Sequence, residues 1–480
     1  MRLDPPVATS AVPASSEAPP VSTAPEQAQP DDDPVDGGDR GDPTGVGVGD
    51  ALFPNAGNPG IDVEHYDVVL SYDPGSDDVT GTVEIDLTTT DARDEITLDI
   101  GDDLTVASIE LDGSPIEFAS EPPELHLQLG RTVVAGERLR LRVSYAGDPN
   151  PTSAPYGLDA GWVDTPGGSF VLNEPVAART WLPCNDHPSD KATWSFSITV
   201  PAGMTAVANG ALTEHRTTEG GELWVWEQDE PMATYLVQLL TGDYELVEQP
   251  AVDGVEIVHA VLADDRDRMQ QYFDLTDDMI RFFEPLFGPY PLDRYGIAIT
   301  DSFPGLAMET QGRSMFSRDD FLFDDGYVTE LLLSHELAHQ WFGNAVTPAR
   351  WRDIWLNESF ATYGQWLWLA GGDPAALEGM AEAALEQRSF IDAATGDPTA
   401  ANMFDFAVYD GGAVVLHALR KVVGDDAFFA ILQTWVADNT GTSRTTGDFI
   451  AHVERSSPGF PASFWNEWLY ARDLPGTYPG

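Results

Sequence analysis

Two histidines and a glutamate stand at a spacing that suits a metal site. They are His335, Glu336 and His339, within the run Leu331-Leu-Leu-Ser-His-Glu-Leu-Ala-His-Gln-Trp-Phe-Gly343. The run has good helix formers and no internal proline, and Gly343 stands near its expected end. Residues four apart share one helical face, so both imidazoles can bind one metal ion, with Glu336 beside them. A core helix with two hydrogen-bonded histidines is the alternative interpretation.

A catalytic zinc ion needs a third protein ligand and an open position for water. Glu358 lies nineteen residues beyond His339, in the run Trp355-Leu-Asn-Glu-Ser-Phe-Ala-Thr-Tyr363 that opens another predicted helix. This spacing leaves room for a loop and an antiparallel return. Two neutral imidazoles and one carboxylate leave zinc able to lower the pKa of its water to about 7. We therefore predict one Zn²⁺ per chain on His335, His339 and Glu358, with Glu336 as general base and then acid.

These motifs and their surroundings resemble the M1 family of zinc metallopeptidases (aminopeptidase N-like, with the gluzincin ligand arrangement), over roughly residues 55–475. The resemblance implies an α+β fold in which an antiparallel β-sandwich precedes a mostly helical, thermolysin-like catalytic domain. The sequence ends soon after Phe464-Trp-Asn-Glu-Trp-Leu-Tyr470, where the catalytic domain of this family closes. We therefore expect a short form without the large helical C-terminal domain of longer members.

Two segments resemble the family's anchors for the free amino terminus of a substrate. Gly305-Leu-Ala-Met-Glu-Thr310 is similar to the Gly-Ala-Met-Glu-Asn exopeptidase motif, with Leu306 and Thr310 at its Gly and Asn places. The run from Asn173 to Cys184 is similar to the acidic anchor segment of the β domain. A buried ammonium group needs negative partners, and anchors from two domains place the site at their interface. The predicted substrate-binding residues are Glu174, Ala307, Met308 and Glu309.

Tyr409 matches the tyrosine of a family pattern, Tyr-x-Lys-Gly, that opens a helix; Gly411 takes the lysine place. A phenol at this position can donate to the oxyanion of a tetrahedral intermediate, so we predict Tyr409 as a catalytic residue. A core tyrosine at a helix start is the alternative. His187 follows Cys184 at a place where the family has an acid, and we interpret it as structural.

Hydrophobic periodicity locates the elements that must position these residues. Residues 66–72, 79–87, 139–145 and 195–200 alternate with period two, which predicts short strands of a sandwich. Helical periodicity begins with the apolar set from Met269 to Phe283. Further helices are expected near 331–341, 356–370, 375–388, 411–422, 425–437 and 463–471. The predicted domains are 1–50, 51–247 and 248–480.

Composition limits the classes of partner. The chain has 24 basic and 80 acidic residues, a net charge of -56, which excludes a nucleic-acid binder that works by phosphate neutralisation. Cys184 is the single cysteine, so an internal disulfide and a thiolate metal site are excluded. No apolar stretch is long enough for a transmembrane helix. Residues 1–50 are rich in Pro and Asp and are expected to be disordered. We predict a tether for an extracytoplasmic or cell-surface protein; a dispensable tail is the alternative.

The sequence therefore predicts a zinc aminopeptidase that removes N-terminal residues from peptides with a free amino terminus. A thermolysin-like endopeptidase would need the zinc ligands but no amine anchors. A non-catalytic peptide-binding protein on the same fold would usually lack a zinc ligand or the base, and this sequence has all of them. The oligomeric state and the natural substrate stay open.

Overall fold

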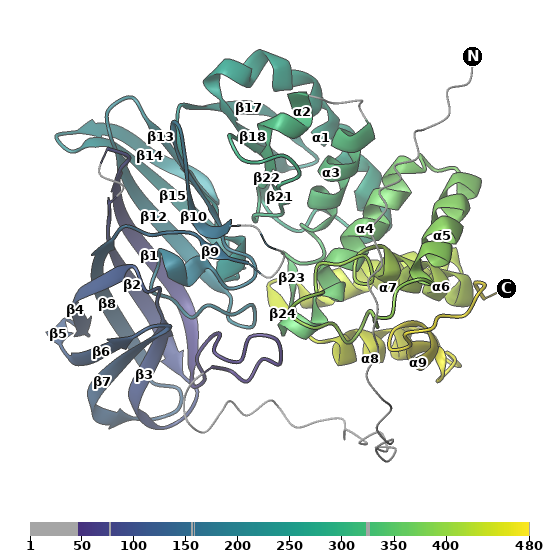
Figure 1. Ribbon diagram of the computed structural model, residues 1–480, viewed down its shortest axis with the longest axis horizontal. Helices are drawn as coiled ribbons and strands as arrows, with labels where there is room; N and C mark the ends of the chain where they lie inside the picture. Colours follow the sequence, from purple (N-terminus) through teal and green to yellow (C-terminus); the bar gives the residue numbers. More distant parts are fainter. Residues whose placement is uncertain (1–46, 76–77, 155–156, 158, 323–326, 480) are drawn as a thin grey trace, which may run out of the picture. The chain divides into compact units, whose positions relative to one another are not determined.

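The computed structural model describes residues 47–75, 78–154, 157, 159–322 and 327–479. Strands dominate up to about residue 262, and helices dominate beyond residue 265 (Figure 1). This order confirms the predicted fold class, in which a β-rich domain precedes a mostly helical one. The predicted segment 1–50 lies outside the described residues, except for its last four.

An eight-stranded sheet forms the larger layer of the β domain, with the order β14-β15-β12-β1-β2-β8-β4-β5. Alternate residues of a strand face the same side, and in β1 the side chains of Tyr66, Val68, Leu70 and Tyr72 are all buried. The strands are β1 (Ile61–Asp73), β2 (Asp78–Thr89), β4 (Leu104–Leu111), β5 (Ser114–Pro115), β8 (Arg138–Gly147), β12 (Ala192–Val200), β14 (Ala211–Thr218) and β15 (Gly221–Met232).

One strand pair departs from the predicted antiparallel pattern. β1 and β12 pair in parallel, whereas the other neighbours in this sheet are antiparallel. The chain forms β2 to β11 between these two strands, and this long connection returns β12 beside β1 in the same direction.

A five-stranded sheet, with the order β13-β16-β11-β10-β9, packs against the inner face of the larger one. The rings of Tyr72 on β1 and Trp162 on β10 lie 4.8 Å apart, and the Trp226 indole donates to the carbonyl of Ala206. These strands are β9 (Thr152–Ser153), β10 (Asp159–Thr165), β11 (Gly168–Leu172), β13 (Thr205–Ala208) and β16 (Leu239–Gly242). A third sheet contains β3 (Arg93–Asp99), β6 (Glu117–Glu121) and β7 (Glu124–Val133).

The catalytic domain begins with a mixed sheet and continues into helices. β18, β20 and β22 are parallel, and the antiparallel strands β17 and β21 form the two edges. The strands are β17 (Tyr244–Val252), β18 (Val255–Leu262), β19 (Arg294–Tyr295), β20 (Ile297–Thr300), β21 (Ala307–Met308) and β22 (Ser314–Ser317), and a separate pair is β23 (Val346–Pro348) with β24 (Thr442–Arg444). The predicted boundary at 247/248 falls within β17.

The helices follow the predicted order, with two additions. They are α1 (Arg266–Phe287), α2 (Arg318–Leu322), α3 (Tyr327–Ala338), α4 (Trp355–Leu369), α5 (Pro374–Arg388), α6 (Asp410–Val423), α7 (Asp425–Asn439), α8 (Thr446–Ser456) and α9 (Phe464–Trp468). Sequence reasoning missed the five-residue helix α2 and also α8, although Thr445 and Asp448 form a capping box at the start of α8. None of the described helices is both long and apolar enough to cross a membrane.

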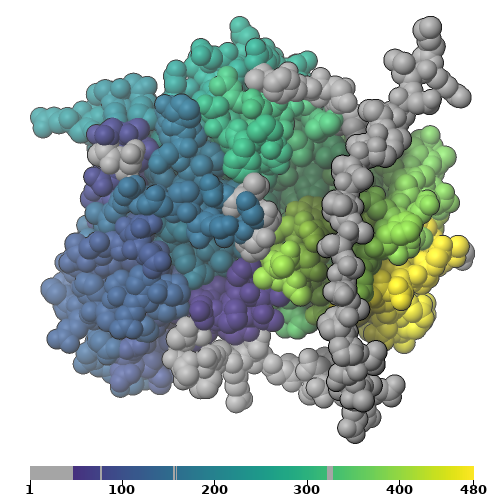
Figure 2. All heavy atoms as spheres, in the orientation of Figure 1, coloured from purple at the N-terminus to yellow at the C-terminus, as the bar shows by residue number. Residues whose placement is uncertain are grey.

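Two polar contacts join the β domain to the catalytic domain close to the predicted metal site. The Lys191 ammonium donates to the carbonyls of Asn344 and Ala345, at 2.6 and 3.3 Å. Asp50 accepts from the backbone N–H of Trp351 at 2.8 Å and contacts His187. Figure 2 shows atoms of the first described residues, in purple, between the blue part of the β domain and the green part of the catalytic domain. His187 therefore has a structural contact, as interpreted from the sequence.

Lys191→Met tests the first contact. The substitution keeps an apolar stem and removes the ammonium donor, so we expect the free energy of unfolding to fall by about 1–3 kcal/mol in urea titrations. Lys421→Met is the matched control, because Lys421 is the one other lysine of the chain and makes a partly exposed pair with Glu378. That control should change stability by less than about 1 kcal/mol. Equal effects of the two substitutions would contradict a role for Lys191 at the junction.

Candidate metal centre and active site

Both histidines of the predicted metal site lie at the C-terminal end of α3. His335 lies in the last turn, and His339 follows directly after the helix, with its N–H still bonded to the His335 carbonyl. Glu358 lies in the first turn of α4. The Nε2 atoms of His335 and His339 lie 3.4 and 3.5 Å from Glu358 Oε2. The structure therefore brings the three predicted ligands together, and all three are buried.

This arrangement fits zinc by geometry and by donor type. Zinc bonds to nitrogen and oxygen measure about 2.0–2.1 Å, so tetrahedral ligands stand about 3.3–3.4 Å apart. The measured nitrogen–oxygen separations are 3.4 and 3.5 Å, and one donor atom from each of the three residues lies within 4.8 Å of the others. Two imidazoles and one carboxylate form a catalytic zinc set that leaves a fourth position open.

Glu336 lies beside these ligands without being one of them. Its Oε2 is buried and has no hydrogen-bond partner among the described residues. Burial raises the pKa of Glu336 well above its usual value, although the nearby His339 opposes the shift. A carboxyl group with a raised pKa can accept a proton and later return it near neutral pH. The position and chemistry suit the predicted general base.

Glu174 and Glu309 reach the same place from different domains. An oxygen of each lies within 4.8 Å of a Glu358 oxygen, and Glu309 forms a similar group with Glu336 and His339. All four carboxylates are buried. Burial raises the pKa of Glu174 and of Glu309, and their mutual repulsion adds to the shift of Glu174. Such crowding favours the binding of positive charge.

The loop that carries Glu174 follows β11, and hydrogen bonds made by the residues on either side of Glu174 hold this loop in place. The Asn173 amide donates to the carbonyl of Val237 and accepts from the Trp181 indole. Farther along the loop, Arg179 lies 3.0 Å from Asp99 and 3.3 Å from Asp186, and its Nε donates to the carbonyl of Val176. Two buried carboxylates therefore fix the guanidinium group that holds the loop.

Glu309 is held through both its backbone and its side chain. Its carbonyl accepts from the side chains of Asn344 and Gln340, and its Oε1 accepts from Asn357 at 2.8 Å. Thr310, which stands at the family's Asn place, donates to the carbonyl of Arg313 and accepts from Gln238. It therefore closes the turn after β21 by a different set of bonds.

Ala307 and Met308 make up β21 and pair with Phe316 and Met315 of β22. β21 is the last strand in the order of this sheet, so its second edge has no strand partner among the described residues. Glu309 directly follows β21 in the sequence, so the unpaired edge of this strand leads to the predicted amine anchor.

Tyr409 caps the start of α6 and stacks on a predicted metal ligand. Its ring lies 5.8 Å from that of His335, with 18° between the planes. Ser359 donates to the carbonyl of Val408 at 2.7 Å and so fixes the adjoining backbone. Burial and the nearby Glu358 raise the pKa of Tyr409 well above its usual value. The phenol therefore keeps its proton and can donate it in a hydrogen bond.

Sequence reasoning missed Asn357, which contacts a predicted ligand and a predicted anchor at once. Its Oδ1 lies 2.6 Å from His339 Nδ1, and its Nδ2 donates to Glu309. Those partners lie 18 and 48 residues away in the chain, so no local pattern connects them. Gln365, about two turns beyond Glu358, was also missed; burial lowers the pKa of His335, and the Gln365 side chain is among the groups that oppose this shift.

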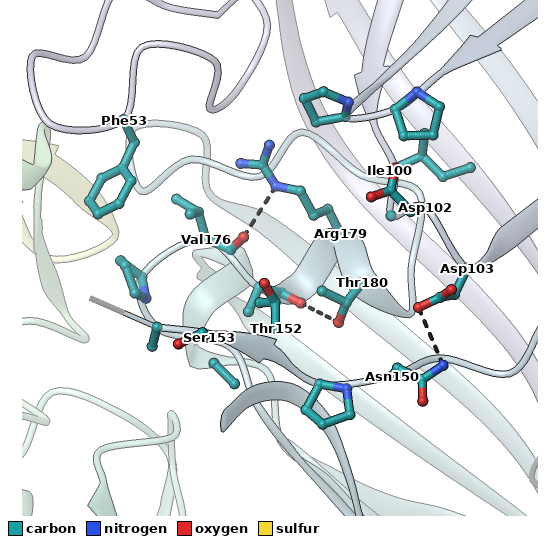
Figure 3. A pocket seen from close by; sticks show the side chains of 18 residues that line it. Phe53, Ile100, Asp102, Asp103, Asn150, Thr152, Ser153, Val176, Arg179 and Thr180 are labelled. Carbon is teal, nitrogen blue, oxygen red and sulfur yellow. Dashed lines mark hydrogen bonds between the residues drawn. The ribbon is translucent and has the colours of Figure 1, made fainter. Parts of the chain in front are cut away.

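Two of the cavities lined by the described residues lie near the loops and helices that carry the site. Figure 3 shows one of about 590 Å³ in the β domain, lined by Asp103, Asn150, Arg179 and Thr180 among others. None of the predicted catalytic or metal-binding residues lines it, although the loop that carries Glu174 forms one wall. A second cavity of about 590 Å³ adjoins the site itself, because Tyr409 lines it. Its other side chains include Leu331, Trp366, Met380, Phe404 and Phe406.

The sequence and the fold are similar to those of known proteins. Residues 62–236 match the Peptidase M1 N-terminal domain, and residues 271–468 match the Peptidase family M1 domain. The crystal structure of an M1 zinc metallopeptidase from Deinococcus radiodurans is 32% identical, with a TM-score of 0.81. The similarity covers 89% of this chain and 98% of that one. The chain belongs to peptidase family M1.

Curated M1 relatives are longer. Probable aminopeptidase 2 of Sulfurisphaera tokodaii is 25% identical over 439 residues, which cover 87% of this chain and 54% of that protein. Leucyl aminopeptidase of Saccharolobus solfataricus is 27% identical, over 77% of this chain and 48% of that protein. The chain therefore spans about half the length of these curated M1 relatives.

Proposed function

We propose that this chain is a zinc aminopeptidase. One observation carries the proposal: Glu174 from the β domain and Glu309 from the catalytic domain place carboxylate oxygens within 4.8 Å of Glu358. A substrate ammonium bound there would put the first peptide bond beside His335, His339 and Glu358. Buried charges of one sign require opposite charges, and a protonated amino terminus supplies one.

The residues then have distinct tasks. A zinc ion on His335, His339 and Glu358 would supply a Lewis acid and lower the pKa of a water molecule. Glu336 accepts the proton of the attacking water and returns it to the leaving amine. Tyr409 donates to the oxygen of the scissile carbonyl as negative charge develops on it.

The positions of the anchors and the second cavity suggest a direction for the peptide. Glu309 connects through Asn357 to His339, whereas Tyr409 stacks on His335. The ammonium end therefore lies on the His339 side, and the leaving part extends toward the cavity lined by Tyr409 and Phe406. The free edge of β21 offers backbone groups to an extended substrate.

The relatives' activities support this proposal over its rivals. Leucyl aminopeptidase of Saccharolobus solfataricus is among them, and a mutant of the Deinococcus radiodurans enzyme has been crystallised with the substrate Tyr-Ser-Ala. An endopeptidase would have to accommodate peptide on both sides of the scissile bond, where the carboxyl groups of Glu174 and Glu309 crowd one side. A location outside the cytoplasm or at the cell surface stays a prediction that rests on the composition of residues 1–50.

Glu336→Gln should abolish turnover of an aminoacyl chromogenic substrate while zinc stays bound. The substitution removes the proton acceptor, and loss of a general base typically lowers kcat by 10²–10⁴-fold. Zinc content is measured by atomic absorption after dialysis. Glu330→Gln is the matched control, because Glu330 lies on the same helix but accepts from the Trp368 indole. Wild-type activity of Glu336→Gln at full zinc occupancy would exclude Glu336 as the base.

Tyr409→Phe should lower kcat by about 10²–10³-fold with little change in KM, because one donor to the developing oxyanion is lost. Steady-state kinetics at saturating zinc measure both constants. Tyr363→Phe controls for loss of a buried phenol, since Tyr363 bonds to His417 rather than to the site. If both variants keep the wild-type kcat, another group stabilises the oxyanion.

Glu309→Gln and Glu174→Gln should each lower kcat/KM for free-amine peptides by about 10–150-fold, mainly through KM. A hydrogen bond to a charged group is worth about 1.5–3 kcal/mol. N-acetylated peptides should be very poor substrates of the wild type, which peptide hydrolysis followed by chromatography measures.

Salt separates this local effect from the diffuse field of a chain with a net charge of -56. The field between exposed charges is screened beyond about 10 Å at 0.1 M salt, whereas a contact pair in a desolvated pocket largely survives. The two variants should therefore remain defective at about 0.5 M salt. Cleavage of blocked peptides at the rate of free ones would favour the endopeptidase instead.

A further inference from the structure

Asn357 joins the two halves of the site through a single side-chain amide. It lies in the first turn of α4 and is fully buried. On one side its Oδ1 lies 2.6 Å from Nδ1 of His339, and on the other its Nδ2 lies 2.8 Å from Oε1 of Glu309. The amide therefore bridges a predicted metal ligand and a predicted amine anchor.

The chemistry of the partners determines which way the amide points. The NH₂ group donates to Glu309 Oε1, which as a carboxyl oxygen accepts the bond. The amide oxygen then faces His339 and accepts the hydrogen on Nδ1. That bond keeps the proton on Nδ1, which leaves the lone pair on Nε2 directed toward Glu358, 3.5 Å away. The carbonyl of Phe342, at 3.2 Å, is a second acceptor for the same N–H.

The chain makes room for this amide. Gly343 has a φ of 119°, a conformation that favours glycine. A Cβ atom at this position would lie 1.8 Å from Asn357 Oδ1. The loop after α3 therefore passes directly against the amide oxygen, and the absence of a side chain at residue 343 leaves the space that the amide occupies.

We infer that Asn357 is a positioning residue that couples the amine anchor Glu309 to the metal ligand His339. The role of Glu309 as an anchor for the substrate ammonium rests on the proposed function. The connection between Glu309 and His339 rests on the two contacts of the Asn357 amide. By fixing the tautomer and orientation of His339, Asn357 strengthens metal binding. By donating to one oxygen of Glu309, it holds the carboxylate in place and leaves the other oxygen for the substrate ammonium.

The test replaces Asn357 with leucine, which has a similar volume and makes neither bond. Zinc affinity is measured on the purified full chain by competition with a fluorescent chelator, which requires no enzymatic activity. We expect the zinc dissociation constant to rise about 10–100-fold, as is typical when a residue that orients a metal-binding histidine is lost. At saturating zinc, KM for a free-amine substrate should rise roughly tenfold.

The double variant with Glu309→Gln shows whether Asn357 acts through Glu309. Glu309→Gln alone should raise KM and change zinc affinity by less than about threefold, since the His339 contact remains. If Asn357 acts on the amine through Glu309, the two substitutions together should raise KM hardly more than Glu309→Gln alone. The zinc defect should persist in the double variant. A general structural defect would instead multiply the two effects on KM.

Trp355→Phe is the matched control on the same helix. Trp355 is fully buried and donates to Thr446 at 2.8 Å, away from the site. The Trp355→Phe substitution should lower the melting temperature, while zinc affinity and KM stay within about twofold of the wild-type values. Asn357→Ser, a smaller polar change that also loses both contacts, serves if the leucine variant does not fold.

Two results would overturn the inference: a zinc dissociation constant within threefold of wild type in the folded variant, or KM effects that multiply in the double variant. Failure of the proposed function is a separate result. In that case the wild type would not prefer free-amine peptides, whereas the zinc defect of the Asn357 variant would still appear.

Discussion

Four buried carboxylates around one small volume are the constraint on which the site depends. Glu174, Glu309, Glu336 and Glu358 would repel one another strongly without positive charge between them, because burial removes the screening effect of water. The two imidazoles alone cannot balance the negative charge of four carboxylates. A divalent metal ion and a substrate ammonium together supply three positive charges, which explains why one cluster suits both. The fold must therefore hold these acids rigidly before either cation arrives.

The two domains share that task. The catalytic domain supplies the metal ligands, the base and Glu309 from α3, α4 and the segment after β21, whereas Glu174 comes from the β domain. Arg179 between Asp99 and Asp186 holds the Glu174 loop, and Lys191 reaches the carbonyl of Asn344. The Asn344 side chain in turn donates to the carbonyl of Glu309. The first set of contacts fixes the loop of Glu174 within the β domain, and the second ties the β domain to the residue that holds Glu309.

Charge acts on two length scales in this protein. The net charge of -56 is spread over a surface where water and ions screen it, and it bears on solubility and on the approach of substrates. The acids of the site are buried, and their protonation depends on their direct contacts. Burial raises the pKa of Glu336; burial also acts to raise that of Glu358, but its contacts with His339 and His335 lower it below its usual value. Neighbouring carboxyl groups can thus act as base and ligand because their surroundings differ.

Local sequence patterns determined the elements and most of the chemistry. Period-two and helical periodicities predicted the order of strands and helices, since each reflects which side of an element is buried. His335, Glu336 and His339 are predictable because their geometry lies within one helical turn. Glu358, Glu309, Glu174 and Tyr409 were reached through motif resemblance, and that they meet became visible only in the fold.

Tertiary structure alone decided the remaining features. The parallel pairing of β1 with β12 depends on the path of a long connection, which no short pattern encodes. Asn357 has the same amide chemistry at any place in a chain, and its role depends on partners 18 and 48 residues away. Hydrogen bonds between distant residues are set by how the helices and sheets pack. The sequence therefore determined which groups could do the chemistry, and packing decided which of them are held together.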